Sequence, residues 1–124
     1  MKKVLDVGQC AADHGSICRL VQSNFDARVA GADDSREALE KLRGEKFDLV
    51  LVNRLLDLDS SEGLAIIRAI KADPVLAQTP VMLVTNFAEH QQQAIAAGAE
   101  PGFGKSQMHA PETVKRLQKF LGDG

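Results

Sequence analysis

The sequence predicts an α/β domain in which helices cover both faces of a parallel five-stranded sheet. Short apolar runs alternate along the chain with longer segments of helical period, which is the pattern of repeated strand–helix units. The run Leu49-Val50-Leu51-Val52 is apolar throughout, which indicates a strand buried on both faces. The chain has 124 residues, of which 44% are hydrophobic, so we expect one domain that covers residues 1–124.

The first half of the chain should supply three strands and two helices. We expect strands at residues 4–7, 28–30 and 49–52, and helices at about 12–25 and 35–42. Asp34 with Glu37 three residues later is the pattern of a capping box at the start of the second helix. Gly44 is typical of the end of such a helix.

The second half should supply two strands and three helices. We expect helices at about 61–73, at 89–97 before Gly98 and from Pro111 onward, and strands at 81–84 and 101–104. Pro101 and the neighbouring glycines make the fifth strand a poor one. Five strand–helix units predict a flavodoxin-like (βα)5 three-layer sandwich with strand order 2-1-3-4-5.

Composition and charge exclude several classes of protein. A formal net charge of −2 and a pI near 5.9, with no Trp or Tyr, argue against a nucleic-acid-binding domain. No apolar run is long enough to span a membrane, and the first residues do not form a signal peptide. Two cysteines form no disulfide framework, so we expect a cytoplasmic protein.

Any chemistry should lie at the carboxyl ends of the strands, where open α/β sheets bind their ligands. Four loops should meet there, at residues 8–12, 53–60, 85–88 and 105–107. Asn53 stands directly at the end of the third expected strand, at a position where an aspartate would be a nucleophile or a metal ligand.

Three motifs at these strand ends carry a family resemblance. They are FDLVLVN before a loop and a helix, PVMLVT at the fourth strand, and AAGAE followed by GFGKS. With them, the whole chain resembles the CheY-like receiver domains of bacterial response regulators. The resemblance implies a phosphoacceptor aspartate after the third strand and an acidic pair after the first that holds Mg²⁺. It also implies a Thr or Ser after the fourth strand and a Lys after the fifth that contact the phosphoryl group.

This chain keeps only part of that set. Thr85 and Lys105 match the family, whereas Asn53 occupies the phosphoacceptor position. Gly8 and Gln9 occupy the acidic pair; a shift of one residue would instead make the pair Gln9 and Cys10.

Two further differences from the family pattern lie close to Lys105 in the sequence. Ser106 stands where the family has a proline, and Gly102 stands at the position of the switch aromatic, with Phe103 one residue later. Glycine has no side chain to move, so we expect the family's coupling between threonine and aromatic residue to be lost.

These losses predict a pseudo-receiver. A carboxamide is a far poorer nucleophile than a carboxylate, and Mg²⁺ prefers anionic oxygen ligands. We therefore expect no enzymatic activity, no cofactor and no metal, and signalling by contact with a protein partner, either a signalling protein or an output domain. The resemblance places that contact on the fourth helix, fifth strand and fifth helix, and it also allows a homodimer.

Two alternatives remain open from the sequence. Asp57 or Asp59 in the lengthened loop after Asn53 would serve as a displaced phosphoacceptor. The same fold would serve as a small-molecule or metal sensor, for instance with the four-residue spacing of Cys10, His14 and Cys18 as a zinc site.

One acid in the first strand needs its own explanation. Asp6 interrupts an apolar run, and a buried acid needs a partner. Lys105, left without an aspartate at position 53, is a candidate for that partner.

Overall fold

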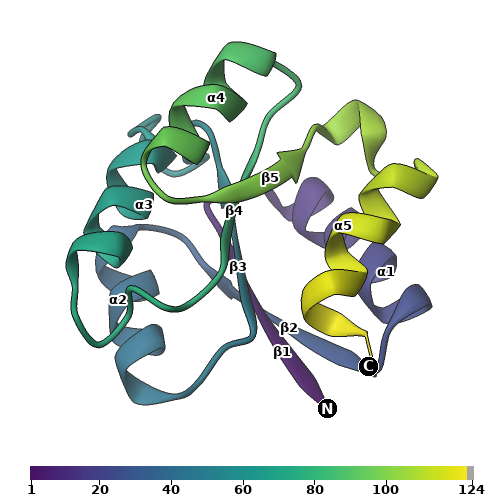
Figure 1. The fold of residues 1–124 in the computed structure, drawn as a ribbon, viewed down its shortest axis with the longest axis horizontal. Coiled ribbons are helices and arrows are strands. Elements are labelled where there is room, and N and C mark those ends of the chain that lie inside the picture. The colour runs from purple at the N-terminus through teal and green to yellow at the C-terminus, as the bar shows by residue number, and fades with distance from the viewer. Residues whose placement is uncertain (123–124) are drawn as a thin grey trace.

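Five parallel strands form one sheet in the order β2-β1-β3-β4-β5, and helices cover both of its faces (Figure 1). The computed structural model describes residues 1–122. The predicted fold class and strand order are confirmed, and each strand–helix unit occurs where the hydrophobic pattern places it.

The boundaries differ from the predicted ones by a few residues. The strands are β1 (Lys2–Val7), β2 (Ala27–Ala32), β3 (Leu49–Asn53), β4 (Val81–Val84) and β5 (Glu100–Phe103). The helices are α1 (Ala11–Asn24), α2 (Ser35–Gly44), α3 (Gly63–Ala72), α4 (Ala88–Ala96), the short η1 (Lys105–Gln107) and α5 (Pro111–Leu121). Strand β2 is twice the predicted length because it pairs with β1 from Lys2 to Val7.

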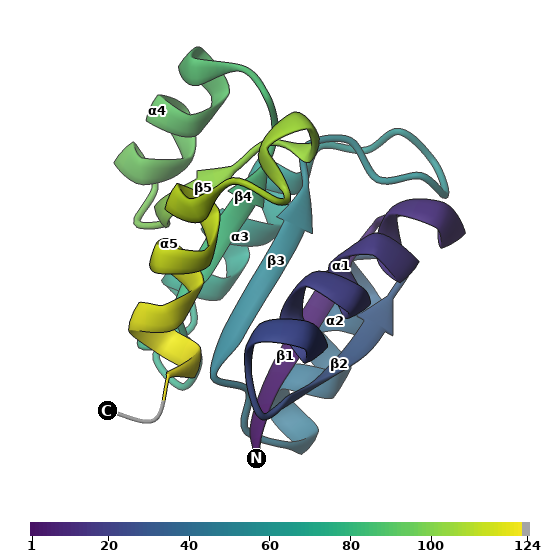
Figure 2. The same cartoon turned by 90° about the vertical axis from the view of Figure 1, so that its right-hand side faces the viewer.

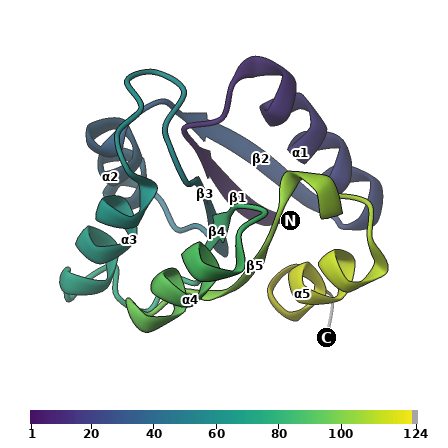
Figure 3. The same ribbon diagram turned by 90° about the horizontal axis from the view of Figure 1, so that it is seen from above.

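The helices form two layers, with α2, α3 and α4 on one face of the sheet and α1 and α5 on the other (Figure 3). Strand β3 is buried on both sides, as its apolar run predicts. Val50 and Val52 pack into the layer of α2 and α3, and Leu49 and Leu51 pack into the layer of α1 and α5. Alternation of side chains along a strand produces this division.

The second helix begins as predicted and ends differently. The Glu37 amide donates to Asp34 Oδ1 at 2.9 Å, which confirms Asp34 as the cap of this helix. The Glu37 carboxylate accepts from the Asp33 amide at 2.6 Å, one residue before the amide that a capping box would use. The prediction of a glycine stop at Gly44 was wrong. Gly44 is the last helical residue and does not have a positive φ angle, and the chain leaves α2 through an extended Glu45.

A glycine stop does occur at the end of α4. Gly98 has φ = 107°, and the amide that follows it, from Ala99, donates to the carbonyl of Ala94 at 2.9 Å. This left-handed turn sends the chain directly into β5.

No helix within residues 1–122 has the length and the apolar character needed to cross a membrane.

Candidate functional site

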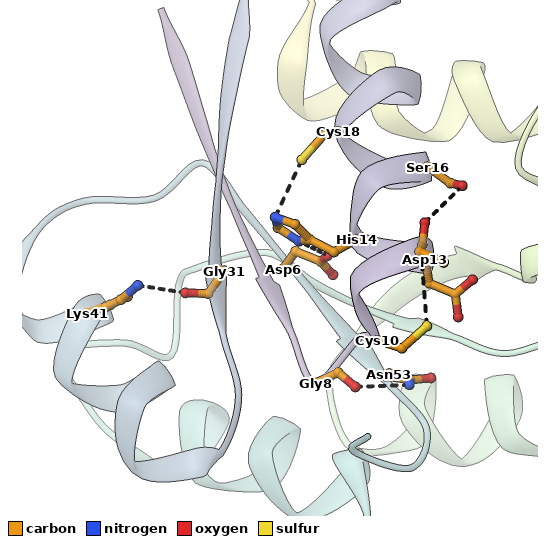
Figure 4. A network of polar contacts seen from close by, with 11 residues as sticks. Asp6, Gly8, Cys10, Asp13, His14, Ser16, Cys18, Gly31, Lys41 and Asn53 are labelled. Carbon is orange, nitrogen blue, oxygen red and sulfur yellow. Dashed lines mark hydrogen bonds and ion pairs between the residues drawn. The ribbon is translucent and has the colours of Figure 1, made fainter. Parts of the chain in front are cut away.

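The carboxyl ends of β1 and β3 are joined through the carbonyl oxygen of Gly8. Asn53 Nδ2 donates to this oxygen at 3.1 Å (Figure 4). The Asp57 amide also donates to it, at 2.9 Å. Gly8 has φ = 79°, and a Cβ atom on it would lie 2.2 Å from Leu56 Cδ2. A side chain at this position would therefore need both a strained backbone and displacement of the buried Leu56.

Asn53, Thr85 and Lys105 lie together around one hollow, which we call the β3–β4 hollow. Its other lining residues are Arg54, Leu55, Val84, Asn86 and Phe87. No carboxylate of residues 1–122 lines it, and Arg54 and Lys105 both bring positive charge. The strand ends therefore gather the residues that the sequence singled out.

Thr85 is held in place by the neighbouring backbone. Its amide donates to the Phe103 carbonyl at 3.0 Å, and its hydroxyl accepts from the Phe87 amide at 3.3 Å. The side chain thus satisfies a backbone group just before α4 begins.

Lys105 pairs with Asp13, not with Asp6. The Lys105 ammonium donates to Asp13 Oδ2 at 2.7 Å, and this contact lowers the pKa of the Asp13 carboxyl group. Sequence reasoning missed Asp13 because the two residues are 92 positions apart. The available signal was an acid in the first turn of the helix that follows a strand end.

Asp6 pairs with His14 instead. Asp6 Oδ2 lies 2.7 Å from His14 Nδ1, and Cys18 Sγ lies 3.5 Å from His14 Nε2, so the three side chains form a row from β1 along α1 (Figure 4). Burial raises the pKa of Asp6 to about 6, and the contact with His14 opposes this rise. Burial and the nearby Asp6 charge also raise the pKa of the Cys18 thiol.

Asp57 and Asp59 lie on an exposed turn between β3 and α3. Leu56 and Ser61 pair across this turn, and Ser60 takes a left-handed φ of 60° at its tip. Hydrogen bonds from Ser61 lower the pKa of Asp59. The turn projects beyond the carboxyl end of β3 (Figure 2), and it delays the start of α3 from the predicted residue 61 to Gly63.

The carboxylates and the Thr85–Lys105 pair lie around different hollows. Asp57 lines a second hollow together with Asp6, Gln9 and His14, between α1 and the ends of β1 and β2. Lys105 and Thr85 line the β3–β4 hollow and do not line this second one.

The residues at the strand ends do not fit Mg²⁺, the ion that the resemblance implies. Among residues 1–122, the lining of the β3–β4 hollow offers Mg²⁺ amide and hydroxyl oxygens but no carboxylate, and Arg54 places a cation beside them. The Gly8 carbonyl already accepts two hydrogen bonds.

The cysteines also do not form the zinc site considered from their spacing. Cys10 Sγ accepts from the Asp13 amide at 3.5 Å as the cap of α1, whereas Cys18 contacts His14. Within residues 1–122, no three His, Cys, Asp or Glu side chains are grouped to hold a metal ion.

At the expected position of the switch aromatic, a side chain from α4 fills the space beside Gly102. Gln91 Nε2 donates to the carbonyls of Leu83 and Thr85 at 2.9 and 3.3 Å, and its Oε1 accepts from the Gly102 amide at 3.0 Å. A Cβ atom on Gly102 would lie 2.2 Å from the Leu83 oxygen. Arg116 of α5 donates to the Gly102 carbonyl from the other side.

Comparison with known proteins agrees with this fold. Residues 10–117 match the family model described as the response regulator receiver domain. The chain is 28% identical over 88 residues to the polar-differentiation response regulator DivK of Brucella anthropi, covering 70% of each protein. It is 27% identical over 94 residues to a gliding motility regulatory protein of Myxococcus xanthus, covering 74% of this chain but 12% of that protein.

A solved structure extends the similarity to nearly the whole chain. The Vibrio cholerae chemotaxis protein CheY4 is 27% identical and superimposes with a TM-score of 0.77, covering 98% of this chain and 99% of CheY4. The chain therefore belongs to the response regulator receiver domain family, whose members act in two-component signal transduction.

Proposed function

We propose that this chain is a pseudo-receiver, a single receiver-like domain over residues 1–124 that signals in the cytoplasm through protein contacts and without aspartyl phosphorylation. Asn53, Gly8 and Gln9 are its altered phosphoacceptor and acidic-pair positions, and Thr85 and Lys105 are the retained ones. The domain signals by contacts that its surface makes with a protein partner, and it does not catalyse a reaction.

The separation of the two hollows is the observation that carries this proposal. Phosphoryl transfer to an aspartate needs the nucleophile, the metal-binding carboxylates and the Thr and Lys side chains around one phosphoryl group. Thr85 and Lys105 line the β3–β4 hollow with Asn53, whereas Asp6 and Asp57 line the other. The Lys105 ammonium is also occupied by Asp13.

The contacts of Gln91 support the loss of the family's switch. Its amide spans β4 and β5 at the place that a moving aromatic side chain would need. The face formed by α4, β5 and α5 would then present one conformation to its partner. Exposed residues on this face include Gln92, Gln93, Ile95, Lys115 and Lys119.

A covalent labelling experiment tests the proposal. The purified chain is incubated with Mg²⁺ and acetyl phosphate, and its intact mass is measured beside a receiver that retains its phosphoacceptor aspartate. The proposal predicts a phosphoryl adduct on the reference receiver and none on this chain.

A Mg²⁺-dependent phosphoryl adduct on this chain would overturn the proposal. Asp57→Asn and Asp59→Asn variants would then locate it, since loss of the adduct in one of them would identify that residue as a displaced phosphoacceptor.

A further inference from the structure

The second hollow is lined by polar groups that the proposed function leaves unused. We call it the α1–β2 hollow; it is bounded by Asp6, Gln9, His14, Gly31, Asp33 and Asp57. Its volume is about 260 Å³. This lies below the roughly 300–1,000 Å³ of sites for drug-sized ligands, so it suits a smaller molecule.

A buried carboxylate oxygen in this hollow has no partner within residues 1–122. Asp6 is 1% exposed; its Oδ2 contacts His14, but its Oδ1 makes no hydrogen bond. Gln9 lies near enough to favour the ionised Asp6, yet its Oε1 and Nε2 are also buried without a hydrogen bond. Buried polar atoms without partners are costly, so a ligand that pairs with them gains free energy that an exposed acid would not provide.

The shape of the hollow depends on Gly31. A Cβ atom there would lie 3.3 Å from His14 Cε1, so a larger residue would press against the imidazole ring. His14 in turn holds Asp6 Oδ2, which leaves Oδ1 as the free oxygen.

The charges around the hollow favour a cation. Asp6, Asp33 and Asp57 contribute carboxylates, while the ammonium of Lys105 is paired with Asp13. The Lys41 ammonium donates to the Gly31 carbonyl at 2.6 Å and lies 3.9 Å from Glu37. A metal ion fits poorly, because no three His, Cys, Asp or Glu side chains of residues 1–122 are grouped to ligate one.

We propose that the α1–β2 hollow binds a small organic cation of the amine or guanidine class. Asp6 Oδ1 and the Gln9 amide are enclosed in the unliganded structure, so the half-buried Gln9 side chain turns aside to let N–H groups of the cation donate to Asp6 Oδ1 and Gln9 Oε1. The site is separate from the β3–β4 hollow, and the proposal does not depend on whether the chain is phosphorylated.

Two cations of equal charge separate hydrogen bonding from simple attraction. Backbone amide NMR spectra are recorded near neutral pH and at constant ionic strength during titration with methylguanidinium chloride or tetramethylammonium chloride. We expect methylguanidinium to cause saturable shifts at Asp6, Gln9, His14 and Gly31. Tetramethylammonium has no N–H group and should cause none.

Three variants localise the site. Asp6→Asn and Gln9→Ala should each weaken methylguanidinium binding, by about tenfold or more for Asp6→Asn. Gln9→Ala keeps the test valid if Asp6→Asn disturbs the fold. Asp59→Asn removes an exposed carboxylate outside the hollow and should bind like the unchanged chain.

Equal shifts from both cations, or shifts that do not saturate, would overturn the proposal in favour of general attraction to acidic residues. Unchanged binding by Asp6→Asn and Gln9→Ala would also overturn it. Saturable shifts at the same residues with Mg²⁺ but not with methylguanidinium would assign the site to a metal ion instead.

Discussion

Asp6 interrupts the apolar run Val4–Val7 of β1, and its carboxyl group is buried against α1. In a receiver-like sheet this position would ordinarily contribute to the core. Here Asp6 and His14 form a polar contact inside the layer of α1 and α5, and the row continues to Cys18.

The burial of Asp6 predicts a pH dependence of stability. Its pKa is raised from 3.8 to about 6 in the folded chain, so the folded state binds the Asp6 proton more tightly than the unfolded state. The resulting stabilisation is complete below pH 3.8 and is lost as the pH rises through about 6. We expect Asp6 to lower the free energy of unfolding across this window by on the order of 1–3 kcal/mol.

Urea unfolding between pH 4 and pH 7 measures this effect. The Asp6→Asn variant should show a flatter dependence over the same window, because its amide does not titrate. The variant keeps the other titratable and charged groups near position 6, which are His14, Cys18 and Lys105. Parallel curves for the two proteins would contradict the assignment of the pH dependence to Asp6.

Gly8 is constrained by its backbone and by its neighbour. We expect Gly8→Ala to lower the free energy of unfolding by about 2 kcal/mol, from the left-handed φ and the clash with Leu56. Gly44→Ala is the matched control: its Cβ would meet no atom within 4 Å, and alanine should stabilise α2 by about 0.5–1 kcal/mol. Chemical denaturation of both variants checks this. Equal effects of the same sign would show that Gly8 is not specially constrained.

At the scale of elements, β5 is an edge strand that its two flanking helices help to hold. Its pairing with β4 is interrupted between Met82 and Val84, and Pro101 cannot donate a hydrogen bond. Gln91 from α4 and Arg116 from α5 supply partners to the backbone groups around Gly102.

Removing the Gln91 amide should loosen this edge of the sheet. We expect Gln91→Ala to cost about 1–3 kcal/mol, because it leaves the Gly102 amide and the Leu83 carbonyl without that partner. Amide hydrogen exchange should become faster at Gly102. Gln92→Ala, on the exposed side of the same helix, should change neither quantity. Slow exchange at Gly102 in Gln91→Ala would show that β5 is held by other contacts.

The sequence predicted elements well where local chemistry decides them. The apolar run of β3 and the Asp34 cap of α2 were recognisable because burial and capping act over a few residues. The contacts of Asp6 and Lys105 were assigned wrongly. Whether His14 or Lys105 reaches Asp6 depends on how α1 packs on the sheet, and periodicity does not encode that detail.

The contacts that hold the β5 edge of the sheet also could not be predicted from the sequence. Pro101 and the glycines marked a poor strand, but the role of Gln91 was not visible in a run of three glutamines. Only the packing of α4 on β4 and β5 distinguishes Gln91 from the exposed Gln92 and Gln93.

For the whole molecule, the receiver fold is retained and its strand ends are divided between two hollows. One contains Asn53, Thr85 and Lys105, and the other contains the buried carboxylate of Asp6. In the proposed function, this division is the reason that the fold is kept without the family's phosphoryl chemistry. The β3–β4 hollow and the α1–β2 hollow can therefore have separate functions.

The central claim is tested most directly by amide NMR during titration with Mg²⁺ and then with beryllofluoride, a mimic of the phosphoryl group. The claim predicts no saturable shifts at Asn53, Thr85 and Lys105, because no carboxylate of residues 1–122 lines the β3–β4 hollow to hold the metal or the mimic. Saturable shifts that depend on Mg²⁺ and spread from Asp57 or Asn53 to Thr85 would contradict it and would assign this chain to the phosphorylated receivers.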